Sequence, residues 1–251
     1  MKSAPGSLSG QIRKATTATL GVTLATLMAA TGASPASAAS TRVKTWGQNS
    51  EGQLGDGTTT ARRTPVTAAG VTTAGVVSVT AGASHSLALL SNGTVEAWGR
   101  NLEGQLGDGA ALPGGNNLTP GTVAGLSNVV AIAAGLYRSL ALRSDGTVWA
   151  WGSDGNSQLG NGGANTDSPV PVQVVGTGGT GVLTNVTAIA GGAFHSLALA
   201  SGQPVQAWGD NSTGQLGDGN APNDSPFPVG IRTGVSGLTS IAGGGFHSIV
   251  A

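Results

Sequence analysis

The feature that most constrains the fold of this chain is a motif that occurs four times at nearly regular spacing. Its clearest copy, residues 95–109, reads VEAWGRNLEGQLGDG. A repeat of this length is typical of units that cannot bury their own apolar face and must stack on neighbours. The sequence therefore predicts a repeat protein with units that begin near residues 43, 95, 148 and 205. The central tryptophans of the four copies lie 52, 53 and 57 residues apart, at Trp46, Trp98, Trp151 and Trp208.

Each unit contains four short runs that are predicted to be β-strands. In the second unit, the apolar run Val129–Gly135 is rich in β-branched residues and is expected to be buried on both faces. The next two runs, Arg138–Leu142 and Val148–Trp151, are separated by Asp145-Gly146, which predicts a type I′ hairpin turn. The fourth run, Pro171–Val175, begins with a proline, which predicts an edge strand. Little or no helix is expected.

The units differ in their turns and loops. Asn92-Gly93 predicts the same hairpin turn as Asp145-Gly146, whereas Ser201–Pro204 predicts a turn of another type. Residues 176–181 formally match the Gly-x-Gly-x-x-Gly fingerprint of dinucleotide-binding proteins. That fingerprint must open a helix, and a strand-like segment follows here, so the stretch is interpreted as a loop insert.

Four antiparallel strands in a unit of about 50 residues are the pattern of propeller blades. The motif AWGxNxxGQLGDG, combined with GxxHSLAL, resembles the regulator of chromosome condensation repeat, and the resemblance covers residues 43–251. It implies an all-β fold, a β-propeller that usually has seven blades of four strands each. Together with the secretory leader described below, the repeats resemble those of the secreted bacterial members of the family.

The wheel is expected to be open or incomplete, because only four units are present. Ser240–Ala251 supplies the first two strands of a blade, and the segment from Val43 onward supplies the last two, so in a ring these halves would complete one shared blade. Repeats shaped for a seven-fold wheel have the wrong wedge angle for a four-fold one. The exposed end faces predict either a fragment of a longer protein or assembly with further blades or another chain.

Residues 1–38 are interpreted as a secretory signal peptide. Lys2, Arg13 and Lys14 precede an uncharged stretch, and Ala36-Ser37-Ala38 then provides the small-x-small pattern that signal peptidase recognises. The alternative, an N-terminal membrane anchor, fits less well because the apolar run is short and no stop-transfer charges follow. We therefore expect a secreted, extracellular propeller domain, residues 39–251, without membrane attachment after cleavage.

Charge and cysteine content narrow the classes of partner and site. Without the three leader cations, 8 basic and 11 acidic residues remain, which argues against nucleic-acid binding. The chain has no cysteine, which excludes disulfides and thiolate metal sites. No cofactor or metal is expected.

One repeat position carries His85, His195 and His247, with Arg138 in the second unit. A metal site needs ligands that converge, whereas residues on successive blades are spread around a wheel. We therefore interpret these histidines as packing residues that bond to neighbouring backbone. Each is followed by serine, but adjacent side chains on a strand point to opposite faces, so the pairs cannot form a catalytic dyad.

Two further sets of repeated residues are interpreted as structural. The aspartates of the Leu-Gly-Asp-Gly motif are not expected to bind calcium, because calcium needs six or more oxygen ligands. Asp or Asn beside glycine more often bonds to the backbone of its own turn. The tryptophans of the repeat are expected to anchor blade packing. The turn positions are Asp56, Asp108 and Asp218, with Asn161 in the third copy.

Five aromatic residues are the candidates for contact with a partner. Three of them occupy one repeat position, immediately before the histidine position. If that position lies at a rim of the wheel, it provides aromatic groups well suited to binding hot spots; otherwise it belongs to the core. The five are Tyr137, Phe194, Phe246, Trp149 and Phe227.

The predicted function is that of a secreted, non-enzymatic scaffold for protein–protein interaction. Specificity would lie in the varied loops 58–64, 110–119, 163–168 and 220–225. The resemblance includes secreted bacterial propellers that inhibit β-lactamases, but their contact residues are not matched here.

Two alternatives stay open. An enzyme acting on polysaccharide would need paired carboxylates facing one pocket, and its candidates, Glu51 and Glu103, share a repeat position. Guanine-nucleotide exchange on a small GTPase, as in the founding nuclear member, is disfavoured by the predicted secretion and the acidic mature charge.

Overall fold

A computed structural model of the chain describes residues 43–251, apart from 72–74, 164, 233 and 235–236. The chain divides into two units, Met1–Ala39 and Ser40–Ala251. All described residues belong to the second unit, so the predicted signal peptide lies outside the described residues. Within the described ranges, no helix reaches the length and hydrophobicity of a membrane span.

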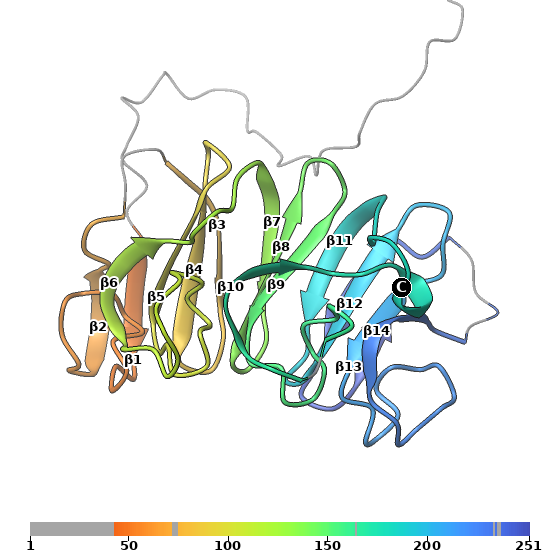
Figure 1. Cartoon of the computed structure of the whole chain (residues 1–251). Helices are drawn as coiled ribbons and strands as arrows, with labels where there is room; N and C mark the ends of the chain where they lie inside the picture. Colours follow the sequence, from red (N-terminus) through yellow and green to blue (C-terminus); the bar gives the residue numbers. More distant parts are fainter. Residues whose placement is uncertain (1–42, 72–74, 164, 233, 235–236) are drawn as a thin grey trace, which may run out of the picture. The chain divides into compact units, whose positions relative to one another are not determined.

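The second unit contains three four-stranded antiparallel sheets that follow one another in chain order (Figure 1). Blade one consists of β3 (Val76–Ala81), β4 (His85–Leu90), β5 (Val95–Gly99) and β6 (Asn117–Thr122). Blade two consists of β7 (Val129–Ala134), β8 (Arg138–Arg143), β9 (Val148–Gly152) and β10 (Ser168–Gln173). Blade three consists of β11 (Val186–Gly191), β12 (His195–Ala200), β13 (Gln206–Gly209) and β14 (Ser225–Gly230).

A two-stranded half-blade flanks the three blades on each side. The first half-blade is β1 (Lys44–Gly47) with β2 (Arg62–Thr67), and the last is β15 (Ile241–Gly243) with β16 (Ser248–Val250). The first strands of successive sheets, β3, β7, β11 and β15, contact one another in that order. The described residues therefore form an incomplete propeller with one half-blade at each side, which confirms the prediction.

The apolar core lies between the blades. Trp151 of blade two packs with Leu87 and Leu89 of blade one, and Trp208 of blade three packs with Leu140 of blade two. Each tryptophan also lies against a glycine of the preceding unit's Leu-Gly-Asp/Asn-Gly motif. The two largest clusters each draw residues from two neighbouring blades, so these blades depend on one another, as expected for a repeat array.

The repeat tryptophans do not share one environment. Trp98, Trp151 and Trp208 are buried, whereas Trp46 is 61% exposed. The prediction that Trp46 anchors blade packing is wrong for the described residues, because the anchor site is the loop of a preceding unit and they contain none before Trp46.

A buried polar chain repeats at each junction between blades. Between blades one and two, the Ser139 hydroxyl and the Trp151 indole both donate to the Gln105 carbonyl, at 2.8 and 3.0 Å. The His85 Nε2 lies 3.1 Å from the same hydroxyl oxygen. Since the serine proton is used on the carbonyl, His85 must donate from Nε2. His85 also has a hydrogen bond with the Arg138 backbone, as the sequence predicts for these histidines, whereas its bond to a serine of the next blade was not predicted.

The other junctions keep this arrangement. Ser196 and Trp208 donate to the Gln158 carbonyl, both at 3.1 Å, and Arg138 Nε donates to the Ser196 hydroxyl at 3.0 Å. At the last junction, His195 Nε2 lies 2.9 Å from the Ser248 hydroxyl oxygen. Arginine carries only donors, so its presence in the histidine position supports the donor assignment.

Two local predictions need correction. The run Val129–Gly135 is not buried on both faces. It forms β7, an edge strand of its sheet, and Val130 is 54% exposed. The Asp145-Gly146 turn is not type I′, because only Gly146 has a positive φ, of 79°. Gly146 N bonds to Arg143 O at 2.9 Å, which gives a three-residue loop ending in a left-handed glycine.

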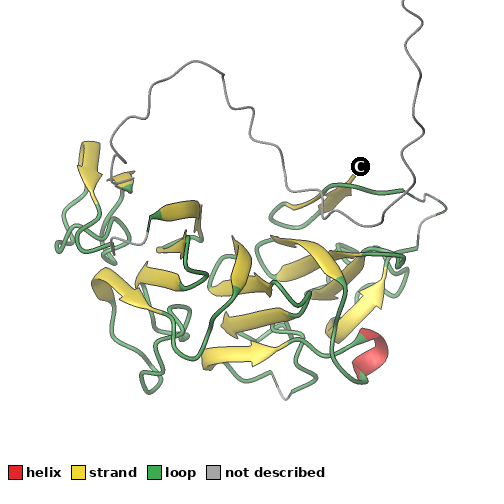
Figure 2. Cartoon of the chain, turned by 90° about the horizontal axis from the view of Figure 1, so that it is seen from above, coloured by secondary structure: helices red, strands yellow, loops and turns green. Residues whose placement is uncertain are grey.

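Other local predictions are confirmed. Asn92-Gly93 matches the Asp145-Gly146 turn, as expected, although the predicted type I′ geometry is wrong for both, because Asn92 also lacks a positive φ. Gly202 carries the positive φ one position earlier in its loop, so that turn differs in type. The proline-containing strands β6, β10 and β14 are edge strands. The loop insert forms a single 3₁₀ turn, η1 (Thr177–Gly179), drawn in red in Figure 2.

Gly191→Ala is expected to lower the free energy of unfolding by about 1–3 kcal/mol, because a Cβ at this position would overlap the Ala134 carbonyl oxygen of the neighbouring blade. Urea unfolding followed by tryptophan fluorescence measures the change. Gly155→Ala is the control, because its Cβ would have no neighbour within 4 Å. Equal stability of the two variants would contradict the close approach of blades two and three.

The buried histidines predict acid sensitivity. Burial lowers the pKa of His85 and of His195 to about 4, from an ordinary value of 6.5. Their contribution to stability is therefore full above pH 6.5 and is lost as the pH falls toward 4, on the order of 2 kcal/mol per histidine. The double variant His85→Gln/His195→Gln is expected to lose less stability than the parent between pH 7.5 and pH 4.5.

Urea unfolding at these two pH values tests the expectation. Asp154, whose raised pKa acts in the opposite direction, is present in both proteins and cancels in the comparison. The control is His247→Gln, because His247 is exposed. The same pH dependence in the parent and the double variant would contradict the assignment.

Candidate functional site

Three of the predicted contact residues lie in the short loops that join the first two strands of successive sheets. We refer to residues 82–84, 135–137, 192–194 and 244–247 as the aromatic rim. Backbone hydrogen bonds of 3.0–3.1 Å join these loops to one another, from Ala83 N to Leu136 O, from Leu136 N to Ala193 O, and from Ala193 N to Gly244 O. Tyr137 and Phe194 are half-buried, and Phe246 is 57% exposed.

The loops that follow the third strands are fastened beside the rim. Asp154 N donates to Asp167 Oδ1, and Asn211 N donates to Asp224 Oδ1, both at 2.8 Å. In blade one, Asn116 Oδ1 accepts from Asn101 N at 3.3 Å. Three of the four varied loops predicted to hold specificity, 110–119, 163–168 and 220–225, are thus fixed by one recurring hydrogen bond while their other residues vary.

Rim and loop residues meet in an open cleft of about 660 Å³. The Phe194 and Phe246 rings form its aromatic wall, with centroids 6.1 Å apart and planes tilted by 39°. The cleft combines two aromatic faces with carboxylates, amides and a hydroxyl. Its lining residues are Asn156, Phe194, Asp210, Ser212, Pro222, Asn223, Asp224 and Phe246.

Tyr137 lies in a different setting on the same rim. The Arg100 guanidinium carbon is 5.1 Å from the Tyr137 ring centroid, and Arg100 is ion-paired with Glu103 at 2.6 Å. The hydrogen bond from Arg100 to Glu103 raises the arginine pKa. Burial acts to raise the Glu103 pKa, but hydrogen bonds from Arg100 and Gln105 outweigh it and the pKa is lowered. Tyr137 is therefore already covered by a cation of this chain.

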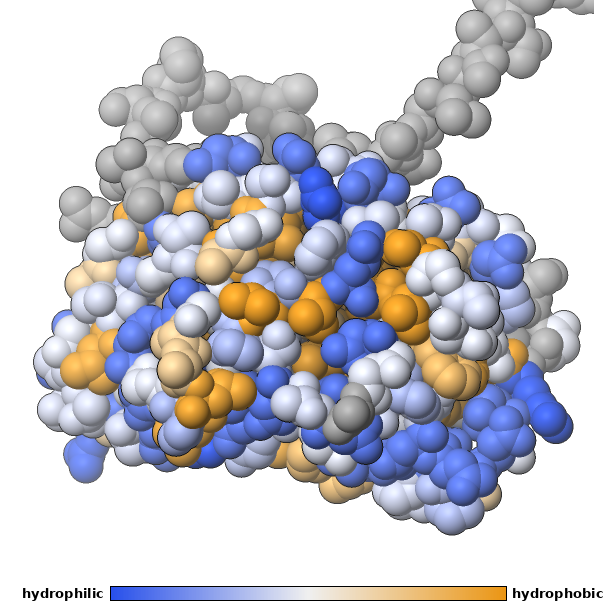
Figure 3. Space-filling view, viewed as in Figure 1, coloured by the Kyte–Doolittle hydropathy of each residue, from blue (hydrophilic) through white to orange (hydrophobic). Residues whose placement is uncertain are grey.

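Trp149 and Phe227 are not part of the rim. Trp149 lies in β9, half-buried against the core shared by blades one and two, with the Arg143 guanidinium carbon 5.8 Å from its ring centroid. Phe227 lies in β14, where the Gly179 loop packs against it. On the face drawn in Figure 3, apolar surface is divided into several patches separated by hydrophilic residues.

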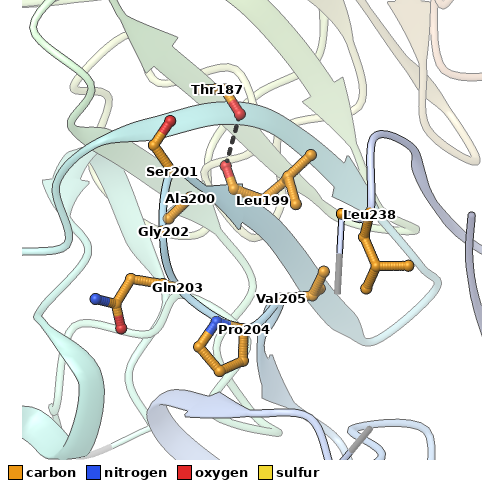
Figure 4. Close-up of a pocket in the computed structure, with 10 residues that line it drawn as sticks. Thr187, Leu199, Ala200, Ser201, Gly202, Gln203, Pro204, Val205 and Leu238 are labelled. Carbon is orange, nitrogen blue, oxygen red and sulfur yellow. Dashed lines mark hydrogen bonds between the residues drawn. The ribbon is translucent and has the colours of Figure 1, made fainter. Parts of the chain in front are cut away.

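A second hollow, of about 480 Å³, lies beside the β12–β13 turn (Figure 4). At the earlier junctions the equivalent turns bond to the next sheet, from Val129 N to Gly93 O and from Val186 N to Gly146 O. The Ser201–Pro204 turn has another shape, and Leu238 stands across the hollow from it. Its lining side chains include no ionisable group, so we interpret it as a gap in blade packing.

The two candidate carboxylates, Glu51 and Glu103, both interact electrostatically with Arg100. The Glu51 carboxylate accepts a hydrogen bond of 2.7 Å from Asn116 Nδ2, and Glu103 is held by Arg100. Sequence reasoning missed the pairing of His85 with Ser139 across blades, which resembles a nucleophile and base. Both groups are buried, however, and the serine proton is committed to the Gln105 carbonyl.

The repeated aspartates lie in turns. Asp56, Asp108 and Asp218 each accept a hydrogen bond of 3.0 Å from the backbone N–H two residues later. Within the described part of the chain, no group of three or more His, Asp or Glu side chains could hold a metal ion.

Blade two carries two charged residues at positions that are otherwise neutral. Arg138 is fully buried and also donates to the carbonyls of Ala193 and His195. Burial lowers its pKa to about 9, against the effect of Asp154. Burial raises the Asp154 pKa to about 6, against the effect of Arg138. The two departures from the repeat thus offset each other electrostatically within one blade.

The regulator of chromosome condensation (RCC1) repeat matches residues 42–89, 92–142, 145–199 and 205–251. The probable E3 ubiquitin-protein ligase HERC6 of Homo sapiens is 36% identical over 214 residues, 83% of this chain and 20% of that protein. The ultraviolet-B receptor UVR8 of Arabidopsis thaliana is 30% identical over 212 residues, 82% of this chain and 46% of the receptor. The chain spans less than half of the length of either relative.

Solved structures show the same fold. Human WBSCR16 has a TM-score of 0.73 and 24% identity, covering 84% of this chain and 53% of that chain. Prp20p of Saccharomyces cerevisiae has a TM-score of 0.67 and 24% identity, covering 81% of this chain and 50% of that chain. The repeat matches, which extend over most of the chain, and this propeller architecture place the chain in the regulator of chromosome condensation (RCC1) repeat family.

Proposed function

We propose that the chain is a secreted, non-catalytic scaffold that binds a partner protein through the aromatic rim. The observation that carries the proposal is the cleft in which Phe194 and Phe246 stand beside the varied loop 220–225. Aromatic side chains next to polar groups are the usual centre of a protein-binding hot spot. Phe194 and Phe246 are already oriented by the backbone bonds of the rim, so binding would require little ordering.

Relatives support a protein as the partner. The structural study of yeast Prp20p describes its binding to Gsp1p and histones, and yeast Prp20 has also been solved bound to Kap60. The identity of the partner of this chain is open, since those proteins are only 24% identical to it.

Secretion is supported by the leader alone. The positive start, the uncharged stretch and Ala36-Ser37-Ala38 together match the pattern of a secretory signal. We expect the protein in the culture medium to begin at Ala39. N-terminal sequencing of the medium and of the cell pellet tests this, and a chain retained in cells with its leader intact would overturn it.

A second prediction concerns the rim. The protein immobilised on beads is expected to retain a specific partner from the surface and medium fractions of the producing cells. Phe194→Ser/Phe246→Ser is expected to reduce retention at least about tenfold, because truncating hot-spot aromatics costs 2 kcal/mol or more. Val130→Ser is the control, since this exposed residue lies on β7 outside the rim. Equal retention by all three proteins would contradict the rim as the binding surface.

A further inference from the structure

The aromatic rim contains a cation-binding arrangement that the chain fills itself at one junction. Between blades one and two, Arg100 lies over Tyr137 and is ion-paired with Glu103. An arginine stacked on an aromatic ring and held by a carboxylate is a favourable combination, because the ring face is electronegative and the guanidinium remains paired.

The same repeat positions carry other residues at the later junctions. Ser153 and Asp210 stand where Arg100 stands in its own unit. The aromatic residues remain, as Phe194 and Phe246, but the chain no longer supplies the arginine. The lining of the cleft contains two carboxylates, Asp210 and Asp224, and no basic side chain.

The two carboxylates are held in place without a counter-ion. Asp210 accepts from Ser212 N at 2.9 Å and from Gln215 Nε2 at 2.7 Å, and it is nearly buried. Asp224 accepts from Asn211 N through Oδ1 and is exposed. Neither aspartate takes part in an ion pair among the described residues. The cleft thus presents fixed negative charge beside two aromatic faces.

We infer that this cleft receives an arginine side chain of the partner protein, which occupies the place that Arg100 takes over Tyr137. The inference rests on the proposed function and names the chemistry that the rim recognises. A guanidinium can stack on the phenylalanine pair while it donates two hydrogen bonds to the Asp224 carboxylate. The ammonium of lysine offers neither the planar face nor the paired donors.

The probe for a binding test is N-acetyl-arginine N-methylamide, titrated into the ¹⁵N-labelled chain and followed by NMR. Saturable shifts are expected at the amides of residues 194, 210–212, 222–224 and 246. The citrulline analogue has the same shape without the charge, and the lysine analogue has the charge without the planar fork. Both are expected to bind at least about tenfold more weakly. Equal binding of either analogue, or no saturable shift at the cleft, would overturn the inference.

A substitution at Asp224 tests the inference without disturbing the fold, because another blade has asparagine in the equivalent role. Asp224→Asn should retain the bond to Asn211 N, because Asn116 makes the equivalent bond in blade one. This variant is expected to weaken binding of the arginine probe about five- to tenfold, whereas Asp145→Asn, in an exposed turn away from the cleft, is expected to leave it unchanged. An unchanged affinity in Asp224→Asn would also count against the inference.

A gain of binding provides an independent check. Arg100→Ala uncovers Tyr137 and removes the cation paired with Glu103, so a second set of saturable shifts is expected around residue 137. Its absence would contradict the equivalence of the two positions. If partner capture depends on Phe194 and Phe246 but the arginine probe does not bind, the inference fails and the proposed function stands. If the probe binds but no partner is captured, the proposed function fails.

Discussion

The interaction on which the rest of the structure depends is the shared backbone carbonyl between blades. The glutamine carbonyls of the first three units each accept both a serine hydroxyl and a tryptophan indole from the next blade, as Gln105 does for Ser139 and Trp151. A buried carbonyl with two lone pairs is fully satisfied in this way. Because the donors and the acceptor lie on different blades, the polar and apolar contacts form together when the blades stack.

This constraint explains which departures from the repeat are tolerated. The repeat position of His85, Arg138 and His195 must donate a hydrogen bond to the serine oxygen of the next blade. Arginine can do so as well as neutral histidine. Arginine, however, brings a charge into a dry junction, and the acid at position 154 limits the cost. At the Arg100 position the compensation is local, since Arg100 is paired with Glu103, and Asp210 at the same position accepts hydrogen bonds from Ser212 N and Gln215 Nε2.

Much of the fold could be predicted from the sequence because its determinants lie at fixed spacing. The tryptophans, the glycine motifs and the prolines of the edge strands mark each blade. The exposure of β7 could not be predicted, because an apolar run looks the same in an edge strand and a central one. The turn at Asp145-Gly146 was assigned the wrong type because Ser144 also belongs to the loop, which composition does not reveal.

The candidate site could be predicted only in part. The aromatic position was visible as a column in the repeat, but its surroundings were not. Arg100 contacts the rim residue Tyr137, and Asp224 lines the cleft beside Phe194 and Phe246. The position of Asp224 is set by a hydrogen bond from Asn211 N, which the sequence does not reveal. The pairing of His85 with Ser139 was missed for a related reason, since reasoning along one strand gives no information on the register between neighbouring blades.

The junctions also share one orientation. His85, Arg138 and His195 each donate from an earlier sheet to the serine of the next one. The rim amides of Ala83, Leu136 and Ala193 donate in the same direction. The two packing faces of a blade therefore carry different hydrogen-bonding groups. Duplication of one unit within the gene would add a blade whose two faces carry the groups that both neighbours require. Growth and loss of whole blades is thus an evolutionary change that keeps the hydrogen-bonding pattern of each junction.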